Sequence, residues 1–208
     1  MTVPPPALGP AVDTGSAVEL LERALASTCG ALATVTPHHL DRRTPCHRWR
    51  LCDLLDHMED CLDAFTEGAG GSVSERSAAP SADPDLLAVL RVKANRLLGA
   101  WTLLASPLGP GMTEPVRFGA HALPLADVAG LAAVEIAVHG WDVATTTGTV
   151  VPMSASLAVD LEPWARWLVV HDLQTAAAGQ PRRFAPPVPA AATADPVRRL
   201  VGLLGRAT

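Results

Sequence analysis

The sequence predicts an all-α protein, a bundle of four long helices with short additional helical segments. Apolar residues recur with a helical period in several long runs, and the alternation typical of a strand is nearly absent. Clusters of glycine and proline separate these runs. Of the 208 residues, 49% are hydrophobic, which is enough for one sizeable core. We therefore expect one helical domain over residues 16–206, preceded by a flexible arm, residues 1–15, which is rich in proline and glycine.

Local signals indicate where each helix begins and ends. The expected helices cover 16–33, 51–65, 84–105, 125–147, 154–178 and 197–204. Ser16 and Asp83 are the expected N-caps of the first and third helices, and Gly148 is the expected residue after the end of the fourth. Pro163 lies inside the fifth run, so we expect a kink or an interruption there. Residues 116–123 are expected to be extended.

Charge and targeting signals restrict the partners. The net charge is -5, and no run of Lys or Arg is present, which excludes nucleic acid and anionic membranes as expected partners. The first residues lack the basic and apolar regions of a signal peptide, and no apolar run reaches membrane-spanning length. Four cysteines without a CxxC pair fit reduced thiols. We expect a cytoplasmic protein that acts on a small molecule.

Three residues form a candidate metal site. Glu135 and His139 are four residues apart in an apolar helical run, so their side chains lie on the same face. His57 lies at the edge of the apolar stripe of the second helix, on a segment far away in the sequence. Two histidines and one carboxylate from facing helices would make a divalent-metal centre with open coordination positions.

Several motifs, in this order and spacing, resemble a known family. They are Thr44-Pro45-Cys46 followed by Trp49, Asp53 to His57, Glu135 with His139 to Ala144, Gly148, and Leu200 to Arg206. The chain from about Ser16 to Arg206 is similar to metal-binding proteins of the DinB-like superfamily, specifically to the N-terminal domain of mycothiol-dependent maleylpyruvate isomerase.

The resemblance implies a DinB-type four-helix bundle whose divalent metal, usually zinc and sometimes nickel, is held by His57, Glu135 and His139. It also implies a thiol-dependent transferase or isomerase. In such enzymes a low-molecular-weight thiol such as mycothiol or bacillithiol is deprotonated at the metal and attacks an electrophilic substrate. The isomerase continues into a C-terminal domain where this sequence ends, so we expect a reaction other than maleylpyruvate isomerisation.

Alternatives remain open from the sequence. The bundle could be a metal-dependent hydrolase, or a non-catalytic metal- or small-molecule-binding protein. His121 or Cys61 could supply a fourth ligand, and Asp142 could orient His139 or be a solvated carboxylate. The other histidines, His38, His39 and His47, are expected at the surface. The five tryptophans are expected in the core or around the pocket, and homodimerisation through an apolar helix face is possible.

Overall fold

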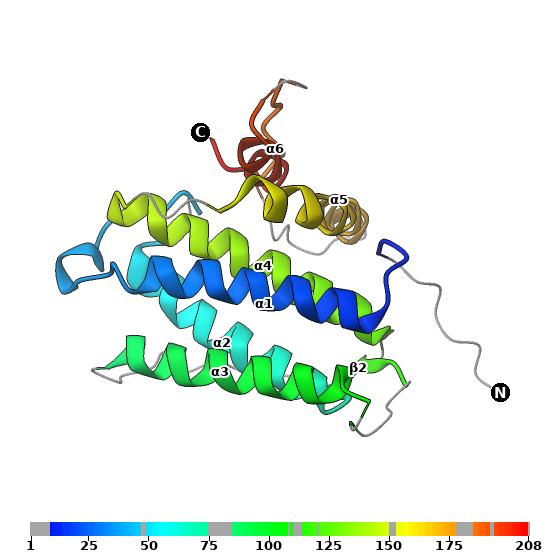
Figure 1. Cartoon of the computed structure of the whole chain (residues 1–208). Coiled ribbons are helices and arrows are strands. Elements are labelled where there is room, and N and C mark those ends of the chain that lie inside the picture. Colours follow the sequence, from blue (N-terminus) through cyan, green and yellow to red (C-terminus); the bar gives the residue numbers. More distant parts are fainter. Residues whose placement is uncertain are drawn as a thin grey trace.

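Four long helices form a bundle in which the first runs beside and parallel to the fourth and the second runs beside and parallel to the third, and two further helices cover one side of it (Figure 1). The computed structural model describes residues 9–46, 49–74, 85–107, 109, 114–119, 121–149, 153–177, 185–191 and 194–207. The bundle helices are α1 (Thr14–Leu32), α2 (Leu51–Ala69), α3 (Leu86–Ala105) and α4 (Leu125–Thr147). The covering helices are α5 (Ala155–Ala177) and α6 (Pro196–Leu203), which lie on the side of α4 away from α2 and α3. The predicted mostly helical fold is confirmed.

The central helix is α4, which packs against α1, α2 and α5. Apolar residues occupy nearly its whole circumference, as expected for a helix with packed neighbours on several sides. Four of its polar side chains, those of Asp127, His139, Asp142 and Thr146, are also buried. Since burying a charged or polar group is costly unless it has partners, the neighbouring pair of His139 and Asp142 points to a constructed polar site inside the bundle.

The α1–α4 contact is close because of a glycine. A Cβ atom on Gly140 would collide with the side chain of Thr28 on α1. The Thr28 hydroxyl donates a 2.9 Å hydrogen bond to the carbonyl of Ile136, one turn earlier on α4. Glycine at this position therefore lets the two helices approach beside His139 and fixes the depth at which that histidine lies.

The helix ends follow the sequence signals with two corrections. The prediction that Ser16 caps the first helix is wrong, because Asp13 is the N-cap and accepts hydrogen bonds from the Ser16 backbone N–H and hydroxyl. Asp85 is the N-cap of α3, whereas Asp83 and the residue after it lie outside the described residues. Gly148, with φ of 74°, ends α4 as predicted.

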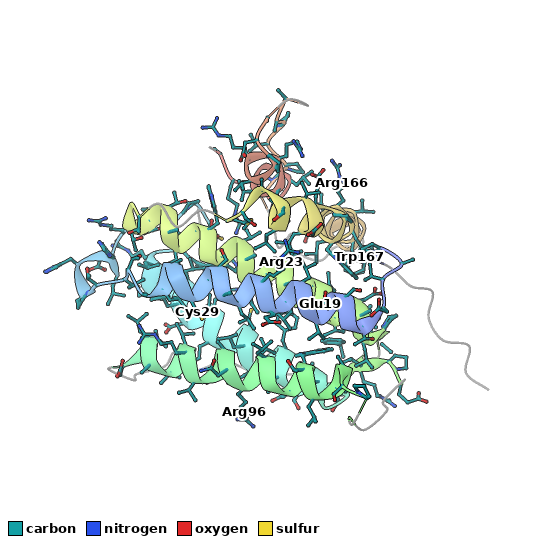
Figure 2. The ribbon with its side chains drawn as sticks, in the orientation of Figure 1. Glu19, Arg23, Cys29, Arg96, Arg166 and Trp167 are labelled. Atoms are coloured by element: carbon teal, nitrogen blue, oxygen red, sulfur yellow. The ribbon has the colours of Figure 1, made fainter. Side chains whose placement is uncertain are left out.

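Helix α5 contains the expected proline and still continues as one helix. The Ser154 hydroxyl caps its first turn by accepting from the Leu157 N–H. Pro163 lies within the helix, and Figure 1 shows the axis turning between the yellow first part and the gold second part, so the predicted kink is confirmed. Arg23 of α1, labelled in Figure 2, makes a 2.7 Å ion pair with Asp160 that ties the bundle to α5.

A small three-stranded sheet lies beside the bundle. Its strands are β1 (Ser72–Val73), β2 (Val116–Phe118) and β3 (His121–Leu123), with β2 in the centre, parallel to β1 and antiparallel to β3. The extended segment 116–123 was predicted, but its pairing with residues 72–73, which lie between the second and third expected helices, was not. No helix in the described part of the chain has both the length and the apolar content of a bilayer-spanning segment.

Candidate metal centre

His57, Glu135 and His139 meet between α2 and α4, as the sequence predicted. One donor atom from each residue lies within 4.8 Å of the other two. Glu135 Oε1 is 2.8 Å from His57 Nε2 and 3.1 Å from His139 Nε2. The carboxylate thus stands between the two imidazoles, one from its own helix and one from the facing helix.

The charges of this group reinforce each other. Burial alone would raise the pKa of the Glu135 carboxyl, but His139 and His57 hold it well below its usual range. Burial would lower the pKa of His139, yet the Glu135 carboxylate and the hydrogen bond that the ring donates to the Asp142 carboxylate raise it to about 9. In the metal-free protein the group therefore holds a proton on His139, and a divalent cation would take the place of that positive charge.

A buried ion pair supports His139 from behind. His139 Nδ1 is 3.0 Å from Asp142 Oδ2, so the ring presents Nε2 to the centre. Arg206, which follows α6, donates to both carboxylate oxygens of Asp142, at 3.3 and 2.8 Å. The side chains of Asp142 and Arg206 are 0% and 4% exposed. The sequence left open whether Asp142 orients His139 or is a solvated carboxylate, and the structure supports the orienting role.

Arg206 is the residue that the sequence reasoning missed as part of the site. It was noted only as the end of a motif, because a basic residue near the end of a chain is normally solvated. The apolar residues Leu200, Val201 and Leu204 around it are buried. An arginine inside such an apolar cluster needs a buried partner, and that is the signal that could have indicated its role.

Trp49 covers the other side of the two histidines. Its ring centroid is 4.5 Å from that of His57 and 5.9 Å from that of His139. The turn from Thr44 to Trp49 holds it there, since the Thr44 hydroxyl bonds to the carbonyls of Cys46 and Trp49. The Thr-Pro-Cys motif thus positions an aromatic wall of the site.

A small cavity opens next to Glu135 and His139. It has a volume of about 20 Å³, room for about one water molecule, and Leu25, Thr28 and Cys29 of α1 and Cys61 of α2 are among its lining residues. Burial and the neighbouring Glu135 carboxylate raise the pKa of the Cys61 thiol well above its usual value. Without a metal, Cys61 is therefore a protonated thiol.

The remaining histidines of the sequence lie elsewhere or outside the described residues. His121 is exposed in β3, paired with Phe118, and is not in the group of potential ligands that the described residues form. Its exposed position in β3 therefore gives no support to the suggestion that it provides a fourth ligand. His38 and His39 lie in a short 3₁₀ helix, Pro37–His39, with His38 exposed as expected and His39 half-buried. His47 lies outside the described residues.

The donor set fits a divalent metal. Two imidazole nitrogens and one carboxylate oxygen are a usual zinc ligand set, and imidazole also suits nickel. The three donor atoms converge from two facing helices, and the second nitrogen of His139 already has its carboxylate partner. Fold and site together define a helical bundle with a candidate two-histidine, one-carboxylate centre.

Comparisons with known proteins agree with this class of fold. The crystal structure of the mycothiol-dependent maleylpyruvate isomerase superimposes with a TM-score of 0.52 at 15% sequence identity, covering 77% of this chain and 69% of that chain. The chain therefore has the DinB-like fold of that enzyme, as predicted. No family model matches.

Two sequences of Mycobacterium tuberculosis are more similar along their length. They are the uncharacterized protein MT0763 of strain CDC 1551 / Oshkosh and the uncharacterized protein Rv0738 of strain ATCC 25618 / H37Rv. Each is 29% identical to this chain over 185 residues, which are 89% of this chain and 94% of the relative.

Proposed function

We propose that the chain is a divalent-metal-dependent enzyme that joins a low-molecular-weight thiol of the mycothiol type to a small electrophilic substrate, as a transferase or an isomerase. His57, Glu135 and His139 hold the metal, zinc by preference and nickel as the second choice. The similar solved structure bears the name of a mycothiol-dependent isomerase, and that name supports the choice of a thiol as co-substrate.

One observation carries the proposal: two imidazole nitrogens and one carboxylate oxygen, all of zinc-binding types, converge within 4.8 Å among the described residues. Structural zinc sites are normally closed by four protein ligands, whereas catalytic sites have three and leave a position open. A bound divalent cation would supply the acidity that converts a thiol into a thiolate at neutral pH.

The residues around the donors have separate tasks. Asp142 and Arg206 fix the ring of His139, and Trp49 limits the movement of His57. The His57 side chain is 31% exposed and that of His139 only 6%. The small substrate and the thiol therefore reach the centre from the side of His57, because the inner cavity has room for only about one water molecule.

The first test is the metal content of the purified protein beside the variants His57→Ala and His139→Ala. We expect about one zinc or nickel per chain in the native protein and a loss of affinity of at least about 100-fold in each variant, beyond the 10–100-fold typical of outer-shell changes. The matched control is His121→Ala, which removes an exposed histidine from β3 and should leave the metal in place.

The second test follows formation of a thiol adduct with small electrophiles by the zinc-loaded protein. The rate should depend on both zinc and thiol, and should fall to background in His139→Ala. A native protein that cannot be loaded with zinc or nickel would disprove the metal centre. A loaded protein that turns over electrophiles equally well without thiol would disprove thiol dependence alone.

A further inference from the structure

A fourth potential donor stands beside the three already described. Cys61 follows His57 by one helical turn on α2, so both side chains lie on the same face. Its Sγ atom is 3.4 Å from His57 Nε2 and 3.7 Å from Glu135 Oε1. The thiol sulfur therefore forms a triangle with these two donor atoms.

These separations are those of sulfur hydrogen bonds in the metal-free protein, and they also match the spacing that a shared metal ion would require. With a Zn–S distance of about 2.3 Å and Zn–N or Zn–O distances of about 2.05 Å, a tetrahedral angle puts sulfur about 3.6 Å from each neighbouring donor. The two observed distances, 3.4 and 3.7 Å, lie on either side of that value. Sulfur donors also favour zinc over magnesium or calcium.

We propose that Cys61 is a fourth, displaceable metal ligand, which holds in the resting protein the coordination position that an external thiol takes during the reaction. The inference rests on the proposed metal centre. As the metal–sulfur bond forms, the S–H bond breaks and the proton passes to solvent. The site is then closed until a competing thiol replaces Cys61. The incoming thiol gives up its proton and the released Cys61 thiolate takes one up, so the supply of thiol regulates the centre.

The test uses cobalt in place of zinc, since cobalt bound to a thiolate shows an intense near-ultraviolet charge-transfer band. We expect this band in the cobalt-loaded native protein and its loss in Cys61→Ser, with about one cobalt per chain in both. The matched control is Cys29→Ser, because Cys29 lines the same cavity from α1 and should not affect the band. Adding mercaptoethanol to cobalt-loaded Cys61→Ser should restore a thiolate band.

A second measurement needs no variant. X-ray absorption at the zinc edge of the native protein, prepared without added thiol, should show one sulfur neighbour at about 2.3 Å. Bound cobalt without a thiolate band, or zinc with only nitrogen and oxygen neighbours, overturns the role of Cys61 and leaves the proposed function intact. A cobalt–thiolate band that is lost in Cys29→Ser also overturns the proposed role of Cys61. Failure to bind either metal removes the proposed centre itself.

Discussion

The two histidines of the candidate centre contact the same carboxylate oxygen but have different surroundings. His139 is 6% exposed, and a buried Asp142–Arg206 pair holds its second ring nitrogen. His57 is 31% exposed and has the ring of Trp49 against it. One side of the centre is therefore fixed by charge in the interior, and the other is positioned by packing near solvent.

This difference indicates how the bundle combines rigidity with access. A buried ionic chain resists reorientation because any displaced charge would be left without a partner. A stacked aromatic ring costs much less to move, so the His57 side can adjust when a ligand enters. The connection through Arg206 also makes the segment after α6 part of the site, although it is distant in the sequence.

The largest expected effect comes from breaking the charged chain behind His139. Asp142→Asn leaves Arg206 buried without a counter-charge, and we expect a loss of about 3–5 kcal/mol in the free energy of unfolding. Zinc affinity should fall about 10–100-fold as well, because the ring of His139 loses its orienting carboxylate. Urea unfolding and zinc titration measure the two effects.

The double variant Asp142→Asn with Arg206→Met separates the effect on stability from the effect on zinc affinity. Removing the second charge should restore much of the stability, since no charge then remains uncompensated, but it should not restore zinc affinity. Equal recovery of both properties would mean that Asp142 acts only through stability and does not position His139.

The next effect is a pH dependence specific to the His139 side. In the metal-free protein the pKa of His139 is about 9, against 6.5 for an unperturbed histidine. Because the pKa is raised in the folded state, protonated His139 stabilises the folded protein fully below pH 6.5. This stabilisation is lost as the pH rises through 9. We expect stability to fall over this interval by at most about 3–4 kcal/mol, since one pKa unit corresponds to about 1.4 kcal/mol.

Urea unfolding of the metal-free protein at several pH values measures this fall. The dependence should persist in His57→Ala, because Glu135 and Asp142 still face His139, and should disappear in His139→Gln. Zinc affinity should rise over the same interval, since metal binding displaces the proton. If stability still fell with pH in His139→Gln, the pH dependence would have to come from another titrating group.

The sequence was sufficient for the elements that depend on local signals. Periodicity and Gly148 predicted α4 with its observed bounds, and the i, i+4 spacing of Glu135 and His139 predicted half of the site. Pairing His57 with them depended on its place in a second apolar helical run and on the geometry of facing helices, and the family resemblance implied the same three residues. These inferences succeed because each uses contacts within one helix or a fold seen elsewhere.

What the sequence could not supply are contacts set by tertiary packing. The pairing of β1 with β2 joins two very short segments, each too short to show a period. The Asp142–Arg206 pair spans 64 residues, and each partner alone has the appearance of a surface charge. Only the packing of α6 against α5, which brings Arg206 to Asp142 of α4, shows that both are buried and that their charges therefore serve His139.

The smallest expected effect tests the packing side of the comparison. Trp49→Leu removes the ring beside His57 but no charge, so we expect zinc affinity to fall by less than about 10-fold, the low end of outer-shell effects. The matched control is Trp167→Leu on α5, where the Trp167 ring stacks on His171 at 5.2 Å. That variant should keep native zinc affinity, and zinc titration compares the two. If Trp49→Leu weakened zinc binding as much as Asp142→Asn, the His57 side would be as rigidly constructed as the His139 side, and substrate entry past His57 would have to be abandoned.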